Sequence, residues 1–400
     1  MKPFCCPKSP SHLTGVLMLS LLLLLVLASA ASATQVTVSF DKLARNTKRF
    51  QEILGQKKLI ATLKGGYGLD HAKVTDWFAR LGIHAIAVDD VSQASKIRDV
   101  LDKGGHKGIE LLALKGFFSR EEAATAANKN ITPVIAYPIT WEIFQKLPQL
   151  IKNDLKLQLF VNTGTNDQGL SPENTLKIAS AAKQNVTGVL SHFTSADTGD
   201  VPTSLKQLRS FNSVVREIKQ LGIELEMVSM AKTLGIPMLS EGNPSDNDDH
   251  THVRVGKGFW AGFPNFGTSD AIRYETEVRA VTDQILQAGD HVGYGGWKVP
   301  PNAVRKIFVL GVGFEKGVPV GLTHVMLPDG SKAEVAGVRM GHTSLAVPPE
   351  TNLEVGDSVV IYGDDRALQS LQEVSRQSGK KISDIVTGLR FIPELVHYQD

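Results

Sequence analysis

Residues 41–270 alternate between short apolar runs and longer amphipathic stretches, and this alternation limits the fold more than any other feature. The apolar runs predict β-strands at 59–63, 85–88, 109–114, 133–136, 157–161, 186–190 and 225–228. The stretches between them have the apolar spacing of helices, at 73–81, 91–101, 120–127, 141–151, 172–183 and 204–221. Strands that alternate with helices of this length predict an α/β fold built on a parallel sheet.

An eighth apolar segment, near residues 253–255, bears on the choice between two parallel architectures. Eight strands favour a (β/α)₈ TIM-type barrel over residues 41–270. An open, doubly wound sheet would explain the same alternation and stays as the alternative at this point.

The pattern changes at about Tyr274, where apolar runs become separated by Gly, Pro and Asp turns. These runs lie at 275–281, 304–312, 323–327, 333–338 and 358–362. Residues 327–331 read LPDGS, which is a hairpin signal. We therefore expect a mainly β C-terminal domain over residues 271–400. The alternation in residues 35–40 fits an edge strand of that domain better than a barrel strand.

The N-terminus has the pattern of a secretory signal peptide, which we place at residues 1–33. Lys2 and Lys8 precede an apolar run at 16–27, and small residues with an A-x-A pattern end at Ala33. This predicts an exported protein, periplasmic or secreted if the source is bacterial. The apolar run is short for a membrane span of about 20 residues. An uncleaved membrane anchor nevertheless remains as an alternative.

Charge and cysteine content exclude several classes of site. The only cysteines, Cys5 and Cys6, precede the apolar run, so the exported chain would have no disulfide and no cysteine-bound metal. The formal net charge is +2, which argues against a nucleic-acid or anionic-membrane surface. The Asp- and His-containing segment 245–252 is read as a solvated loop, and no metal site is predicted.

Lys64 is the first candidate for chemistry. It ends the first predicted barrel strand in the segment ATLKGGYG (61–68). Partial burial at such a position would lower the pKa of the amine, and the neutral amine forms Schiff bases. His192 follows the strand at 186–190, and Arg254 lies in the eighth segment. Residues beyond the carboxyl ends of barrel strands face one rim, so these three side chains are expected to converge.

Several segments resemble the alanine racemase family of fold-type III pyridoxal-phosphate enzymes, in the same order along nearly all of residues 36–400. The segment around Lys64 is similar to the family's AVVKANAYGHG pattern, one residue shorter. SHFTSAD (191–197) resembles THFA-x-AD, RVG (254–256) resembles RPG, and GYG (293–295) resembles SYG. GFEKG (313–317) is a degraded GYADG segment, and GDSV (356–359) resembles the late G-D-x-V turn.

The resemblance implies a racemase of free small amino acids with two bases. Lys64 would hold pyridoxal 5′-phosphate covalently and act on one face of the substrate Cα. Tyr294, reaching in from a partner subunit of a homodimer, would act on the other face. The remaining implied roles are His192 beside the pyridine ring, Arg254 at the pyridine nitrogen, Tyr67, Gly256, Lys257 and Ser229 at the phosphate, and Met340 near the substrate.

Four departures from the family pattern concern the substrate and the phosphate. Asp167 stands where the family has an arginine, and Phe160 and Asn162 replace a lysine and an aspartate. Gly341 takes an acidic position, and Ser383 replaces a phosphate-binding tyrosine. Asp167 would repel a substrate carboxylate unless Lys257 or Arg339 compensates.

These departures leave other functions open. The same cofactor could support decarboxylation or elimination, or the chain could bind the cofactor without turnover. Retention of both Lys64 and Tyr294 favours a racemase, because a protein that only binds the cofactor needs no second base.

Overall fold

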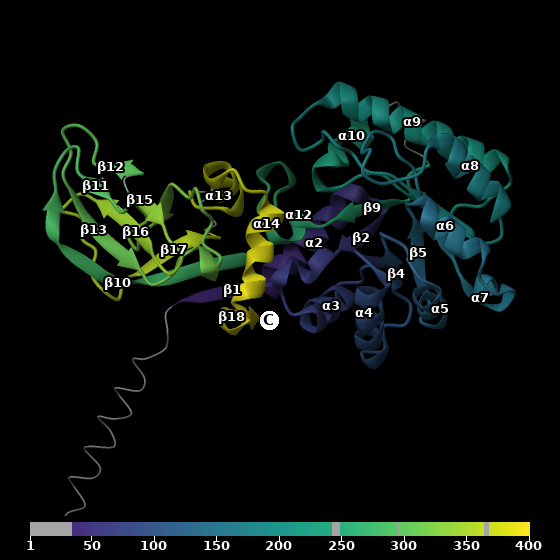
Figure 1. Cartoon of the computed structure of the whole chain (residues 1–400), viewed down its shortest axis with the longest axis horizontal. Helices are drawn as coiled ribbons and strands as arrows, with labels where there is room; N and C mark the ends of the chain where they lie inside the picture. The colour runs from purple at the N-terminus through teal and green to yellow at the C-terminus, as the bar shows by residue number, and fades with distance from the viewer. Residues whose placement is uncertain (1–33, 242–248, 295, 364–367) are drawn as a thin grey trace, which may run out of the picture.

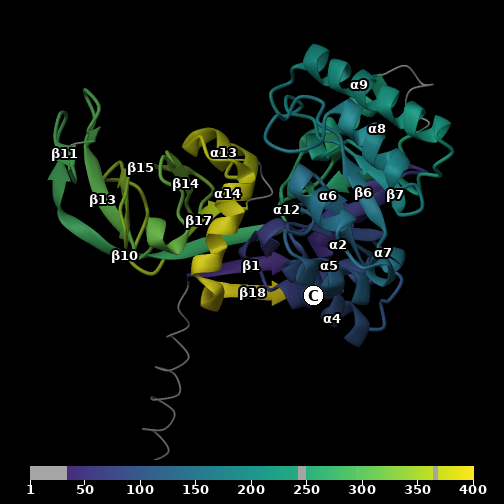
Figure 2. The same cartoon turned by 45° about the vertical axis from the view of Figure 1, so that its right-hand side comes forward.

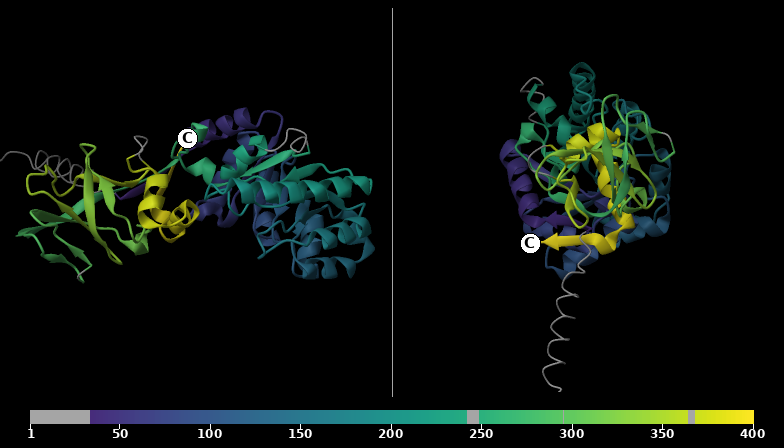
Figure 3. Two further views of the ribbon diagram at one scale, coloured as in Figure 1. Left: turned by 90° about the horizontal axis from the view of Figure 1, so that it is seen from above. Right: turned by 90° about the vertical axis from the view of Figure 1, so that its left-hand side faces the viewer.

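The computed structural model describes residues 34–241, 249–294, 296–363 and 368–400, and the predicted signal peptide lies outside them. Two bodies lie end to end along the longest axis (Figures 1 and 3). One is an α/β barrel and the other is a mainly antiparallel β domain. Within the described ranges, no helix has the length and apolar character needed to cross a membrane.

Eight parallel strands form the barrel, in the sheet order β8-β7-β6-β5-β4-β3-β2-β9. They are β2 (Lys58–Thr62), β3 (Ala85–Val88), β4 (Glu110–Ala113), β5 (Ile131–Ile135), β6 (Leu157–Phe160), β7 (Val186–Leu190), β8 (Met227–Ser229) and β9 (His252–Val255). β9 pairs with β2. The seam between β8 and β9 is joined by backbone bonds from Thr251 N to Val228 O (3.1 Å) and from Arg254 N to Ala231 O (3.1 Å). The barrel prediction is therefore confirmed, and the open sheet is excluded.

Helices cover the outside of the barrel (Figure 2). They are α2 (Phe40–Leu54), α3 (His71–Arg80), α4 (Val91–Lys103), α5 (Arg120–Asn128), α6 (Pro138–Gln145), α7 (Gln149–Asp154), α8 (Pro172–Ala181), α9 (Val201–Gln220), α10 (Ile236–Glu241) and α12 (Lys257–Trp260). Side chains of Asp70, Asp90 and Ser119 accept backbone N–H bonds at helix starts and so fix where those helices begin. The single helix predicted at 141–151 is wrong, because Pro148 separates α6 from α7.

Six strands of the β domain close on themselves in the order β13-β16-β15-β14-β17-β10, since β10 also pairs with β13. They are β10 (Ile272–Leu286), β13 (Arg305–Leu310), β14 (His324–Met326), β15 (Lys332–Val338), β16 (Thr343–Val347) and β17 (Ser358–Tyr362). The hairpin predicted at 327–331 joins β14 to β15 and is confirmed. The N-terminal part of β10, which pairs with β17 on one edge, pairs on its other edge with β1 (Gln35–Ser39), and β1 pairs in turn with β18 (Val396–Gln399).

Two helices, α13 (Leu371–Ser378) and α14 (Ile382–Thr387), lie between the β domain and the barrel (Figure 1, yellow). They lead into η5 (Gly388–Phe391), which packs on η1 (Lys64–Gly68). A Cβ at Gly68 would lie 2.5 Å from Arg390 N, and the φ of Gly68 is 72°. Only glycine allows this close approach. The C-terminal segment therefore rests directly on the turn that carries Lys64.

Candidate active site

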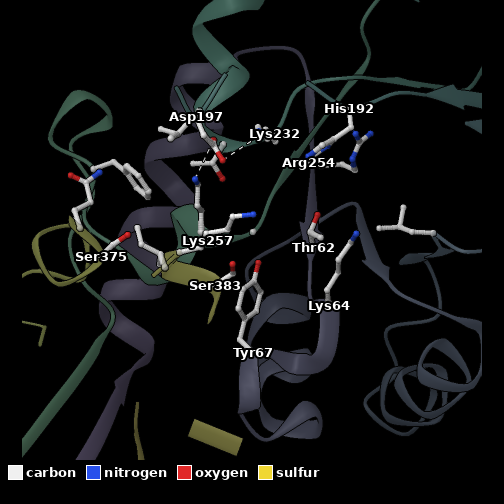
Figure 4. A pocket seen from close by; sticks show the side chains of 18 of the residues that line it. Thr62, Lys64, Tyr67, His192, Asp197, Lys232, Arg254, Lys257, Ser375 and Ser383 are labelled. Atoms are coloured by element: carbon white, nitrogen blue, oxygen red, sulfur yellow. Dashed lines mark ion pairs between the residues drawn. The ribbon is translucent and has the colours of Figure 1, made fainter. Parts of the chain in front are cut away.

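A cavity of about 760 Å³ opens at the carboxyl ends of the barrel strands, and α13 and α14 form its outer wall (Figure 4). Six of the predicted residues line it, namely Lys64, Tyr67, His192, Arg254, Gly256 and Lys257. A cavity of this size with convergent polar groups is typical of a small-molecule site.

Lys64 begins η1, immediately after β2. Solvent in the open cavity reaches its side chain, although protein surrounds it on most sides. This burial lowers the pKa of the Lys64 amine; Asp89 opposes the shift, and Arg254 adds to it. The neutral amine, which is the nucleophilic form, is thereby favoured.

Tyr67 lines the cavity next to Gly256 and is 7% exposed. Its backbone has φ 52°, a left-handed conformation that non-glycine residues seldom adopt and that is often found at functional sites. A Cβ at residue 256 would lie 2.4 Å from Tyr67 Oη, so the phenol occupies space that only glycine leaves free. Burial raises the pKa of the Tyr67 phenol well above its usual range, and the hydroxyl keeps its proton to donate.

Arg254 places a buried positive charge on the opposite wall. Its Nη1 donates to Ser229 O and Ser229 Oγ, both at 2.9 Å, and its Nη2 donates to Ser191 O. Burial lowers the pKa of Arg254 to about 10, so the guanidinium stays charged at neutral pH. Among the described residues it has no carboxylate partner. Burying a cation without a counterion is costly, which is a reason to assign it a function.

Ser229 lies beneath Arg254 and is not part of the cavity wall, because its hydroxyl accepts the guanidinium bond. The structure therefore does not bring it to the other residues predicted for the phosphate. His192 does line the cavity, and burial together with the nearby Arg254 holds the pKa of its imidazole well below the usual range. It is neutral at physiological pH.

Two further charged residues at this end of the cavity were not predicted as site residues. Lys232 follows β8 and Asp197 follows β7, and both line the cavity. Asp197 pairs with Lys232 and with Lys257, at 3.2 Å in each case (Figure 4). The sequence carried a signal for each: Lys232 follows a strand end, as Lys64 does, and Asp197 ends the family-like segment SHFTSAD.

Tyr294 and Met340 lie elsewhere, on the β domain. Tyr294 is in the loop between β11 (His291–Val292) and β12 (Trp297–Lys298) and is 96% exposed. The Arg339 guanidinium lies 5.2 Å from its ring centre, and the adjacent Met340 is 62% exposed. β11 and β12 are at the end of the β domain that points away from the barrel (Figure 1). Within one chain these residues do not reach Lys64.

Family models cover nearly all of the described chain. A model described as "Alanine racemase, N-terminal domain" matches residues 38–263, and one described as "Alanine racemase, C-terminal domain" matches residues 271–394. The chain belongs to the alanine racemase family. The resemblance read from the sequence segments is thereby confirmed.

Other members of the alanine racemase family align over most of their length. The alanine racemase of Alcanivorax borkumensis is 27% identical over 367 residues, which span 86% of this chain and 94% of that protein. Alanine racemase 2 of Bacillus subtilis is 26% identical over 384 residues, 90% of this chain and 93% of that protein.

Solved structures share the fold. A biosynthetic alanine racemase from Pseudomonas aeruginosa superposes with a TM-score of 0.77 at 20% identity, covering 92% of this chain and 100% of that one. The alanine racemase from Acinetobacter baumannii gives 0.76 at 21% identity, covering 92% and 99%.

The structure locates the residues that depart from the family pattern relative to the cavity. Asp167 is exposed on the loop after β6 and does not line the cavity, whereas Phe160, Gln168 and Ser383 do. Asn162 organises this loop, since its Oδ1 accepts the backbone N–H of Gly164 at 2.9 Å. The substituted positions therefore change the lining beside Lys64 while leaving the loop hydrogen-bonded.

Proposed function

We propose that this chain interconverts L- and D-amino acids with pyridoxal 5′-phosphate, using Lys64 and the Tyr294 of a partner subunit as the two bases. One observation carries the proposal. In a chain that family models assign to the alanine racemases, Lys64, His192 and Arg254 line one cavity although three different strands deliver them. The chain is an amino-acid racemase, and its family membership favours racemisation over decarboxylation, elimination or simple binding.

The residues of the cavity fit the cofactor. Thr62 Oγ1 is buried at the cavity wall with no hydrogen-bond partner in the described part of the chain. The missing Cβ of Gly256 leaves a recess beside the Tyr67 hydroxyl, and Lys257 follows with a positive charge. Tyr67, Gly256 and Lys257 would hold the phosphate, Arg254 would face the pyridine nitrogen, and Lys64 would bind the aldehyde carbon.

The bound cofactor supplies an electron sink that acidifies the substrate Cα–H bond. Racemisation then requires that a proton leave one face of Cα and that another arrive on the opposite face. Lys64 Nζ, whose pKa is lowered by burial, takes or returns the proton on its face. Arg254 cannot readily give up a proton at neutral pH, so with the cofactor bound it would leave the pyridine nitrogen unprotonated and would limit side reactions.

The second base comes from another subunit. Tyr294 and Met340 are exposed on the β domain, and the cavity of the same chain lacks them. A two-fold dimer that sets each β domain against the partner's cavity completes both sites at once. Arg339 would then bring its positive charge to the site with the Tyr294 ring.

The predicted signal peptide at residues 1–33 supports an exported protein. We propose that racemisation takes place outside the cytoplasm, in the periplasm or the medium if the source is bacterial.

Deuterium exchange tests the proposed reaction. The chain lacking residues 1–33 is loaded with pyridoxal phosphate and incubated in D₂O with single L-amino acids, beginning with L-alanine. We expect deuterium at Cα together with loss of optical rotation, and no exchange in Lys64→Ala. Lys177→Ala, which removes an exposed lysine paired with Glu173, is the matched control. A loaded wild-type protein that exchanges no Cα proton with any of the amino acids would overturn the proposal.

A further inference from the structure

One carboxylate lies between two lysines at the phosphate end of the cavity. Asp197 Oδ2 is 3.2 Å from Lys232 Nζ, and Asp197 Oδ1 is 3.2 Å from Lys257 Nζ (Figure 4). Asp197 and Lys232 lie in the loops after β7 and β8, and Lys257 begins α12 just after β9, so the three residues follow consecutive strands around the barrel. Both oxygens of Asp197 are therefore used, one on each lysine.

This cluster differs from an ordinary surface ion pair. The side chains of Lys232 and Lys257 are only 17% and 23% exposed, whereas that of Asp197 is 41% exposed. All three face the cavity that contains Lys64. Two half-buried cations held by one more accessible anion leave an excess positive charge, to which the nearby Lys381 adds.

The charges depend on one another. Burial lowers the pKa of Lys232, and Asp197 opposes that shift. Burial would raise the pKa of the Asp197 carboxyl, but Lys257 and Lys232 together hold it below its usual range. The charge of the neighbouring Lys257 also lowers the pKa of Lys232, so without an anion the protonated form of Lys232 would be less favoured. Some anion is therefore needed here whether or not a ligand is bound.

We propose that Lys232 and Lys257 form a clamp for the cofactor's phosphate, and that Asp197 is an internal counterion which the phosphate displaces. The inference rests on the proposed function, because it takes the anion to be that of pyridoxal phosphate. A phosphate monoester carries close to two negative charges and three acceptor oxygens, so it can pair with both lysines at once. Both lysines therefore have an anionic partner before and after the exchange.

The clamp also accounts for a departure from the family. Ser383 occupies the position of a phosphate-binding tyrosine and lines the cavity here. The second lysine, Lys232, supplies a charged donor in its place. Affinity for the cofactor is then set by competition between two anions, one of which belongs to the protein.

Calorimetric titration with pyridoxine 5′-phosphate and with pyridoxine tests the clamp. Neither compound has an aldehyde, so covalent attachment to Lys64 does not enter the measurement. Lys232→Met and Lys257→Met should each weaken binding of the phosphate ester about tenfold or more, as expected for loss of a charge-assisted bond. Asp197→Asn should strengthen it about tenfold, because the competing anion is gone. Binding of pyridoxine should not change in any variant.

Glu173→Gln is the matched control, since it neutralises a carboxylate paired with Lys177 on the exposed face of α8. It should leave both affinities as in the wild type. Asp197→Ala repeats the test without the hydrogen-bonding amide, and circular dichroism of each variant verifies the fold.

Two results would overturn the inference. If both Asp197 variants bind the phosphate ester more weakly, Asp197 orients the lysines for the phosphate and does not compete with it. Unchanged affinity in both lysine variants would place the phosphate elsewhere. The titration measures binding and not turnover, so it is independent of the proposed reaction. If the affinities of the variants rank as expected but the protein racemises no amino acid, the proposed reaction is refuted and the clamp stands.

Discussion

Gly256→Ala tests the close contact between residue 256 and the Tyr67 hydroxyl in the cavity wall. The new Cβ would lie 2.4 Å from Tyr67 Oη, well inside van der Waals contact. Gly256 has φ −131° and ψ −85°, which avoids the left-handed region but lies outside the usual helical and extended regions, so any backbone cost of alanine is common to every background and a double-mutant cycle removes it. Tyr67 is buried and cannot move freely. We expect overpacking to cost about 1–3 kcal/mol of unfolding free energy.

A second substitution isolates the cause. Tyr67→Phe removes the hydroxyl, after which the nearest neighbours of the new Cβ are Thr62 O at 3.4 Å and Thr62 Cβ at 3.6 Å, both ordinary contacts. Gly256→Ala should therefore cost less in the Tyr67→Phe background, and a double-mutant cycle should return the steric cost of about 1–3 kcal/mol as coupling.

Urea unfolding followed by tryptophan fluorescence measures the cycle, since Trp260 lies 5.8 Å from Tyr67 between ring centres. Gly108→Ala is the matched control, because a Cβ at that position would have no neighbour within 4 Å and the φ of Gly108 is not positive. A loss that is equally large with and without the Tyr67 hydroxyl would refute the steric explanation.

Three further predictions concern pH, the Lys64 amine and the dimer. The pKa of the buried His252 is lowered to about 3, so below about pH 6.5 only the unfolded state gains its proton. As the pH is lowered from about 6.5 to about 3, the free energy of unfolding should decrease by up to about 1.4 kcal/mol per pH unit. His252→Gln should flatten that slope in urea titrations, and an unchanged slope would contradict the assignment. Asp89 raises the pKa of Lys64, so in Asp89→Asn covalent attachment of pyridoxal phosphate should begin at lower pH in stopped-flow absorbance; an upward shift would contradict this. Equal mixing of Lys64→Ala and Tyr294→Phe subunits should restore about a quarter of wild-type racemisation, since half the dimers then hold one intact site; no recovery after verified subunit exchange would count against shared sites.

Much of the barrel could be predicted because its strands are buried on both faces and read as continuous apolar runs. β16 was not predicted because Thr343 and Ser344 are polar although buried, which leaves an apolar run of only three residues in the strand. The helices α13 and α14 were missed because their neighbours in sequence are β-strands, and only tertiary packing shows that they belong to the cavity.

The candidate site divides in a similar way. Lys64, His192 and Arg254 could be placed together because barrel topology brings strand ends to one rim. The pairing of Asp197 with Lys232 and Lys257 depends on side-chain direction across the barrel seam, which spacing does not encode. Ser229 was assigned to the phosphate, whereas its position in β8 turns its hydroxyl to Arg254.

The outer wall of the cavity comes from a part of the chain that is made late. Lys64 leaves the ribosome early, but residues 372–383, which close the cavity over it, follow the whole β domain. Domains generally fold in the order in which they are synthesised. A barrel that folded first would thus present its lysine in an open trough, which becomes a walled cavity only when α13 and α14 have docked. Enclosure of the cavity is therefore a step that follows translation of the barrel.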